Sequence, residues 1–152
     1  MLTQEYFLST VEKDFFHLMC GEYIGRGASR QVYELAFDTN FVVKIESEAR
    51  SFANVIEWET WQDTMWIDHA RPWLAPCHSI SPSGAVLIQR RTKPAKKYPE
   101  KIAAWFTDIK RSNFGMIGKR FVCHDYGCNL ICNSGMTKRL VNAKWPMWEQ
   151  GN

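Results

Sequence analysis

Hydrophobic and polar positions alternate with recognisable periods in the first third of the chain. Between Glu5 and Met19 the apolar residues recur where one face of a helix would place them, and Gly21 is expected to end that helix. Residues 22–37 then follow the pattern of a strand, a glycine-rich turn and a second strand. Residues 41–45 add a third strand rich in β-branched side chains, so this region predicts an antiparallel meander.

The middle of the chain alternates between helical and strand patterns. Residues 49–67 predict an amphipathic helix, with phenylalanine, isoleucine, methionine and tryptophan interleaved with acids. Residues 78–80 and 85–89 predict a hairpin around a Ser-Pro-Ser-Gly turn. A short helix is expected over residues 100–106, and a last hairpin around the turn at residues 117–119. The tail, 129–152, has room for one short helix.

The amino-acid composition restricts the number of domains and the class of protein. A chain of 152 residues corresponds to one domain, and 45% apolar with 23% charged residues is ordinary for a globular protein. Seven Trp and nine Phe are many for this length, so several aromatic rings should line a core, a pocket or a partner surface. A net charge of +3 is too small to argue for nucleic acid. The basic run at residues 90–97 is expected to be a solvated loop rather than a binding patch.

The five cysteines are an odd number without a regular framework. The first residues carry charges where a signal peptide needs an apolar core, and no apolar run approaches the roughly 20 residues that span a bilayer. We therefore expect a cytoplasmic protein with reduced thiols and no membrane association. Cys123, His124, Cys128 and Cys132 suggest zinc, but their spacing is not a usual zinc pattern, and buried thiols are the favoured interpretation.

Four polar motifs follow one another along these elements. A Gly25-x-Gly27 turn is followed by Lys44 on a predicted strand and by a predicted helix that carries acids. Later come Asp-x-Lys-x-x-Asn, which starts at Asp108, and Asp-Tyr-Gly, which starts at Asp125. Each motif alone is a common turn, cap or edge residue. Because the four motifs follow one another in this order, the chain resembles the protein-kinase-like superfamily in its reduced bacterial and phage-type versions.

The resemblance implies a fold class and a division of the chain. The fold would be α+β, with a protein-kinase-like N-lobe made of a twisted antiparallel sheet plus one C-type helix, and a severely truncated C-lobe. Residues 1–152 would form a single domain. Within it, 1–19 would be an N-terminal helix, 20–92 the N-lobe-like part, and 93–152 the reduced C-lobe and tail.

The resemblance also implies roles for residues in a site for ATP and Mg²⁺. Residues expected to bind the nucleotide are Gly25, Gly27, Val32, Val42, Lys44 and Gln89. Residues expected to act in catalysis are Asp108, Lys110, Lys44 and Glu57, and those expected to hold Mg²⁺ are Asn113 and Asp125.

Physical reasons accompany these roles. Asp108 would orient or deprotonate an attacking hydroxyl, and Lys110 would stabilise the transferring phosphoryl group. Lys44 would neutralise the inner phosphates while a helix carboxylate holds it in place. Glu57 is preferred over Glu59 as that carboxylate, because the spacing of its neighbours keeps Glu57 off the outward helix face.

The chain departs from the family in several places. Arg30 stands where a third glycine would be expected, and Phe106-Thr107 replaces the His-Arg that precedes the catalytic aspartate. Few residues follow Gly127, so an activation segment and a helical substrate platform have no room. The resemblance covers about residues 20 to 128. The apolar surface that a platform would bury should be covered by the tail, the N-terminal helix or a second subunit.

Three functions follow from these observations, and the sequence leaves open whether the protein is an enzyme. The first is a small kinase-like protein that binds Mg-ATP and phosphorylates Ser or Thr on a protein acceptor. The alternative is a catalytically inactive, pseudokinase-like binding module that inhibits or adapts a host protein, as a phage effector would. A more distant option is a metal-stapled interaction protein built on the cysteine cluster. The expected partners are proteins, including a second copy of the chain.

Overall fold

The computed structural model describes residues 4–46, 51–127 and 135–147, which form an α+β fold around a five-stranded antiparallel sheet. The strands of this sheet are β1 (Cys20–Arg26), β2 (Arg30–Leu35), β3 (Phe41–Glu46), β4 (Cys77–Ile80) and β5 (Val86–Arg90). The other strands are β6 (Lys101–Ala103), β7 (Phe114–Ile117), β8 (Arg120–Cys123) and β9 (Leu140–Asn142). The helices are α1 (Gln4–Met19), α2 (Ala53–Thr64) and the short 3-10 turns η1 (Arg71–Trp73) and η2 (Arg111–Asn113).

The sheet has the strand order β1-β2-β3-β5-β4, which confirms both the predicted meander and the predicted hairpin. Strand alternation gives its two faces different characters. Val43 lies on one face and packs with Leu35 and Cys20 in a small apolar cluster. Lys44 lies on the other face, opposite Val32 of β2. The sheet therefore presents a buried lysine to the side on which α2 packs.

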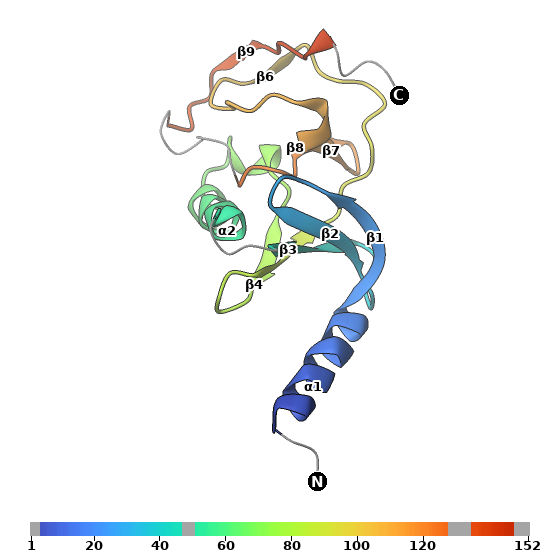
Figure 1. The fold of residues 1–152 in the computed structure, drawn as a ribbon. Coiled ribbons are helices and arrows are strands. Elements are labelled where there is room, and N and C mark those ends of the chain that lie inside the picture. The colour runs from blue at the N-terminus through green and yellow to red at the C-terminus, as the bar shows by residue number, and fades with distance from the viewer. Residues whose placement is uncertain (1–3, 47–50, 128–134, 148–152) are drawn as a thin grey trace.

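α1 confirms the predicted N-terminal helix, but Gly21 does not end it. The helix stops at Met19, and Gly21 lies inside β1. A Cβ at position 21 would lie 3.3 Å from the carbonyl oxygen of Glu34, so the close approach of β2 is the reason that favours glycine there. α1 and the β6–β9 pair lie at opposite ends of the molecule (Figure 1).

α2 is shorter than the predicted helix, and its buried face is not the predicted apolar one. It begins at Ala53, because Phe52 adopts the left-handed conformation with φ 53° and ψ 24°. Phe52, Ile56 and Trp66 are exposed. The buried residues of α2 are Ala53, Asn54, Glu57, Thr60, Trp61 and Thr64. Polar side chains face inward here because the sheet face that they cover carries charged groups.

The helix expected over residues 100–106 is wrong. Residues 101–103 form the strand β6 instead of part of a helix over 100–106, and β6 pairs with β9 in the tail. Within the described part of the tail, residues 135–147, the strand is β9, and the rest of the tail lies outside the described residues. The hairpin formed by β7 and β8 is confirmed, with Ile117 paired to Arg120 across the turn.

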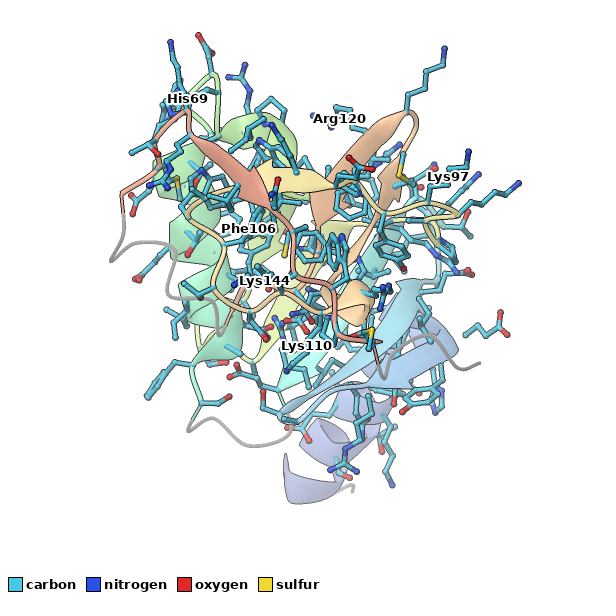
Figure 2. All side chains as sticks on the ribbon, turned by 90° about the horizontal axis from the view of Figure 1, so that it is seen from above. His69, Lys97, Phe106, Lys110, Arg120 and Lys144 are labelled. Carbon is cyan, nitrogen blue, oxygen red and sulfur yellow. The ribbon has the colours of Figure 1, made fainter. Side chains whose placement is uncertain are left out.

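A second, larger apolar core joins α2 to the segments that follow the sheet. Its most buried side chains include Leu74, Ile102, Trp105 and Tyr126. Phe106 lies in the interior of the molecule as seen from above (Figure 2) and contacts Trp105 and Phe114. This core fixes the β7–β8 hairpin against α2. Neither of the two described α-helices combines the length and the apolar content that crossing a membrane requires.

Candidate functional site

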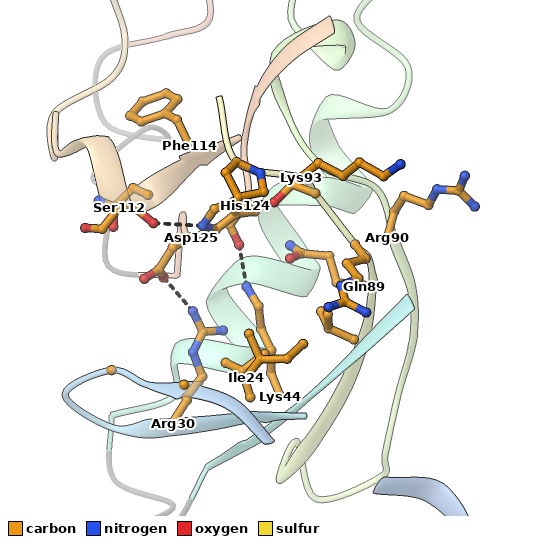
Figure 3. Close-up of a pocket in the computed structure, with 18 of the residues that line it drawn as sticks. Ile24, Arg30, Lys44, Gln89, Arg90, Lys93, Ser112, Phe114, His124 and Asp125 are labelled. Atoms are coloured by element: carbon orange, nitrogen blue, oxygen red, sulfur yellow. Dashed lines mark hydrogen bonds and ion pairs between the residues drawn. The ribbon is translucent and has the colours of Figure 1, made fainter. Parts of the chain in front are cut away.

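A cleft of about 600 Å³ lies between the sheet and the segments around the β7–β8 hairpin (Figure 3). The end of β1 and the turn that follows it form one wall and contribute Gly25 and Gly27. The opposite wall includes Asn113 and Asp125. The predicted residues that line this cleft are Gly25, Gly27, Val32, Val42, Lys44, Gln89, Asn113 and Asp125.

Lys44 and Glu57 form a buried ion pair behind the cleft. The Lys44 Nζ atom lies 2.5 Å from Glu57 Oε1, and the two residues are 4% and 0% exposed. Lys44 also donates a hydrogen bond to the main-chain oxygen of His124 (Figure 3). Glu59, the alternative partner, is exposed on the outer side of α2. The helix thus places Glu57, not Glu59, against the lysine.

Sequence reasoning assigned no role to Arg30, which is central to the site. Its guanidinium donates to both carboxylate oxygens of Glu57 at 3.1 Å, and its Nη2 lies 2.6 Å from Asp125 Oδ1 (Figure 3). Arg30 is 7% exposed. The alternation of side chains along a strand could have indicated that Arg30 belongs to the site. Arg30 precedes Val32 by two positions on β2, and therefore faces the same side of the sheet as Lys44.

Glu57 also accepts hydrogen bonds from the segment that carries Asp125. The main-chain N–H groups of Tyr126 and Gly127 each donate to Glu57 Oε2 at 2.9 Å. Burial alone would raise the pKa of Glu57, but the charges of Lys44 and Arg30 outweigh burial and lower this pKa to about 2. Glu57 is therefore ionised at neutral pH and joins the sheet, α2 and the Asp-Tyr-Gly segment.

Glycine is required at position 127, where the Asp-Tyr-Gly segment packs against the start of α2. A Cβ on Gly127 would lie 2.5 Å from the main-chain oxygen of Ala53 at the start of α2, a distance that real Cβ contacts do not reach. Gly25 and Gly27 differ, because an added Cβ would meet no atom within 4 Å at either position. Neither has a positive φ. The fold does not need glycine at 25 and 27, so their lack of side chains leaves the backbone open to the cleft.

The Asp-x-Lys-x-x-Asn segment forms a small polar cluster at the edge of the cleft. The Asn113 side-chain amide donates to Asp108 Oδ2 at 3.0 Å, and Lys110 Nζ lies 3.3 Å from Asp108 Oδ1. Asn113 lines the cleft, whereas Asp108 and Lys110 lie outside its lining. The Asn113 main-chain oxygen accepts hydrogen bonds from the N–H groups of His124 and Asp125 at 2.8 and 3.3 Å. This cluster is therefore tied to the segment that carries Asp125.

The basic run at residues 90–97 is not simply a solvated loop, and that expectation is corrected. Its first part lines the cleft, with Arg90, Arg91 and Lys93 among the lining residues, because β5 delivers the chain directly to the cleft edge. Arg91 is paired with Glu34 at 2.6 Å. The cationic residues that line the cleft are Arg26, Arg30, Lys44, Arg90, Arg91, Lys93 and Arg111, and Asp125 is the one acid among the described lining residues. Cationic side chains therefore outnumber acidic ones in the cleft lining, and three of them, Arg30, Lys44 and Arg91, are paired with carboxylates.

The thiol and imidazole groups beside the cleft have structural partners. His124 Nε2 lies 2.8 Å from the main-chain oxygen of Ser112, and its Nδ1 lies 2.7 Å from the Thr92 hydroxyl. Burial, assisted by the charge of Lys44, lowers the pKa of His124. Cys123 is buried, and burial raises its pKa. Cys128 and Cys132 lie outside the described residues, among which no group of three or more His, Cys, Asp or Glu side chains could hold a metal ion.

The residues assigned to Mg²⁺ fit a divalent cation poorly in this arrangement. Asp125 Oδ1 already accepts a short hydrogen bond from Arg30, so the one carboxylate assigned to Mg²⁺ is shared with a guanidinium. Mg²⁺ prefers free carboxylate oxygens and retains several waters. A cation beside Asp125 would also stand next to the Arg30 guanidinium, which repels it.

Comparisons with known proteins add no family to this description. No protein-family model matches the sequence, and no curated protein matches it.

Proposed function

We propose that the cleft binds a nucleoside triphosphate in the manner of a protein-kinase-like N-lobe. The observation that carries this proposal is the buried Lys44–Glu57 pair, which lies behind a cleft bordered by a glycine turn and by Asp125. An ammonium group held by a buried carboxylate is a fixed positive charge, and a triphosphate requires fixed positive charges in a site that excludes water. The chain order of these parts supports the same function.

The lining of the cleft offers both apolar and charged surface to such a ligand. Ile24, Val32 and Val42 supply apolar surface on which a base can lie. Lys44 and Arg30 supply charge for the phosphates. Gly25 and Gly27 lack side chains in positions where the fold does not require glycine, and a phosphate chain close to the backbone supplies a reason for them.

Calorimetric titration and thermal unfolding with ATP, GTP, ADP and AMP test this proposal. At a nucleotide concentration about 100 times Kd, the free energy of unfolding should rise by about 2.7 kcal/mol. Lys44→Met should weaken binding by about tenfold or more, because it removes a buried charge from the phosphate end. Lys119→Met, at an exposed position of the β7–β8 turn, is the matched control and should bind as the unchanged protein does. A folded protein that binds none of these nucleotides would refute the proposal.

Phosphoryl transfer to a Ser or Thr of a protein is a second candidate, which the Asp108–Asn113–Lys110 cluster favours. Asp108 lies beside the cleft wall and is ionically paired with Lys110, so a hydroxyl that enters there would meet a carboxylate and a cation. Incubation with γ-labelled ATP and candidate acceptor proteins distinguishes the two functions. Label that Asp108→Asn abolishes supports transfer, and binding without label supports a non-catalytic module.

A further inference from the structure

The Arg30 guanidinium stands beside the carboxylate at which a metal-dependent site would hold its divalent cation. We infer that the cleft binds a nucleoside triphosphate without a divalent metal, and that Arg30 supplies the positive charge in place of Mg²⁺. This inference rests on the proposed function. The inference adds that the nucleoside triphosphate binds as the metal-free polyanion.

Arg30 is held in place by more than its contact with Asp125. It makes a two-pronged ion pair with the fully buried Glu57, and its Nη1 lies 3.2 Å from Asn54 Oδ1. A guanidinium fixed through both of its terminal nitrogens loses little further freedom when it binds another anion. Because Nη2 also contacts Asp125 at 2.6 Å, Arg30 is a permanent cation at that carboxylate.

A divalent cation at Asp125 would have to displace Arg30 or tolerate it. Mg²⁺ binds carboxylate oxygens at about 2.1 Å, which places it within a few ångströms of a guanidinium on the same carboxylate. Displacing Arg30 would leave Glu57 with less positive charge around it in a buried site, which is unfavourable. Both routes disfavour the metal.

The cleft also has enough positive charge to do without a metal. Glu57 and Asp125 offset the charges of Lys44 and Arg30. The cleft is also lined by the cationic residues Arg26, Arg90, Lys93 and Arg111. A metal normally reduces the charge of a triphosphate before it enters a site of mixed charge. Here the lining itself can neutralise the ligand.

The first test compares ATP binding by the unchanged protein in excess EDTA and in excess Mg²⁺. We expect the affinity in EDTA to be less than about tenfold weaker than the affinity in Mg²⁺, or tighter. An affinity that falls by about tenfold or more in EDTA would overturn the inference and leave the proposed function intact. Absence of binding in both conditions would refute the proposed function itself, so the two failures can be told apart.

Two variants test the role of Arg30 in ATP binding. Arg30→Ala should weaken ATP binding in EDTA by about tenfold or more, and Mg²⁺ should recover part of this loss because Asp125 is now free. Arg120→Ala removes the same side chain from an exposed position at the start of β8 and should leave both affinities unchanged. An Arg30→Ala protein that binds ATP in EDTA as the unchanged protein does would contradict the assignment.

Asp125→Asn provides a test that does not depend on the stability of the Arg30 variant. It keeps the shape of the side chain and removes its negative charge. We expect ATP to bind this variant at least as tightly as the unchanged protein, with or without Mg²⁺. If Asp125→Asn instead abolishes binding only when Mg²⁺ is present, then Asp125 holds a metal and the inference is wrong.

Discussion

Glu57 connects more parts of the molecule than any other residue described above. Its carboxylate receives Lys44 and Arg30 from the sheet, Gln89 from β5, and two main-chain N–H groups from the Asp-Tyr-Gly segment. A carboxylate buried among so many donors stays ionised, because the donors replace the water that it has lost. The position of the cleft walls relative to one another therefore depends on one charge.

Replacing Glu57 by Gln tests that dependence. The variant should lose about 3–5 kcal/mol of unfolding free energy, because two buried cations lose their counter-charge. Glu59→Gln is the matched control on the exposed side of the same helix and should change stability by less than about 0.5 kcal/mol. Urea unfolding followed by circular dichroism measures both. Equal effects of the two substitutions would contradict the role assigned to Glu57.

The same carboxylate predicts a pH dependence of stability. Its pKa is about 2 in the folded protein, against an ordinary value of 4.5. A lowered folded-state pKa means that its contribution is complete above pH 4.5 and is lost as the pH falls towards 2. Unfolding free energies measured between neutral pH and pH 3 should therefore fall less steeply for Glu57→Gln than for the unchanged protein. Parallel curves would show that Glu57 titrates normally.

Single residues of the site could be predicted from the sequence where their spacing defined a face. Helical spacing separates Glu57 from Glu59, and strand alternation places Lys44 on the same face of the sheet as Val42. Arg30 was noticed only as a missing glycine, because its partners, Glu57 and Asp125, are far away in the sequence. Its role depends on three segments that come together only in the folded chain.

At the scale of elements, the structure differs from the sequence prediction where pairing is non-local. The run at residues 100–106 is too short for its periodicity to separate a helix from a strand. It becomes β6 because β9, much later in the chain, supplies the hydrogen bonds. The sheet of the first ninety residues was predictable, because its neighbours in space are mostly neighbours in sequence, with turn residues between them.

The tail contributes more than a strand. Trp145 packs edge-to-face against Phe114 at 5.3 Å and Tyr98 at 5.2 Å, and its indole N–H donates to the Pro99 main-chain oxygen at 2.9 Å. Arg111 lies over the Trp145 ring and donates to the Pro146 main-chain oxygen. Because Phe114, Tyr98 and Arg111 also line the cleft, the tail supports one wall of the candidate site.

Two tryptophan substitutions separate this support from general hydrophobicity. Trp145→Ala should destabilise the protein by about 2–4 kcal/mol, because it removes packed aromatic contacts and a hydrogen bond. Trp66→Ala should change stability by less than about 0.5 kcal/mol, because Trp66 is 81% exposed. Circular dichroism in urea is the suitable measurement, since fluorescence changes with either substitution. A Trp145→Ala protein as stable as Trp66→Ala would mean that the tail does not support the wall.

At the scale of the whole molecule, charge is distributed unevenly in a way that composition conceals. The net charge of +3 is modest, yet arginine and lysine gather around one cleft with a single acid among its described lining residues. The sequence suggested no such concentration, because the cationic residues come from β1, β2, β3, β5, the segment after β5 and η2. The field inside a cleft depends on this local sum and not on the net charge of the chain.

This charge distribution predicts that the proposed nucleotide binding depends on salt. Between about 0.1 M and 1 M NaCl the Debye length falls from about 10 Å to about 3 Å, so the exposed cations at the cleft rim, such as Lys93, should be screened from the phosphates. We expect the Kd for ATP to rise by roughly tenfold over this range, and the Kd for AMP to rise less because AMP carries less charge. Lys44 and Arg30 are buried and are screened less, so part of the affinity should persist at high salt. Calorimetric titration of each nucleotide at several salt concentrations measures the slopes, with circular dichroism to check that the fold is unchanged. Equal slopes for ATP and AMP would contradict a cleft that recognises its ligand by phosphate charge.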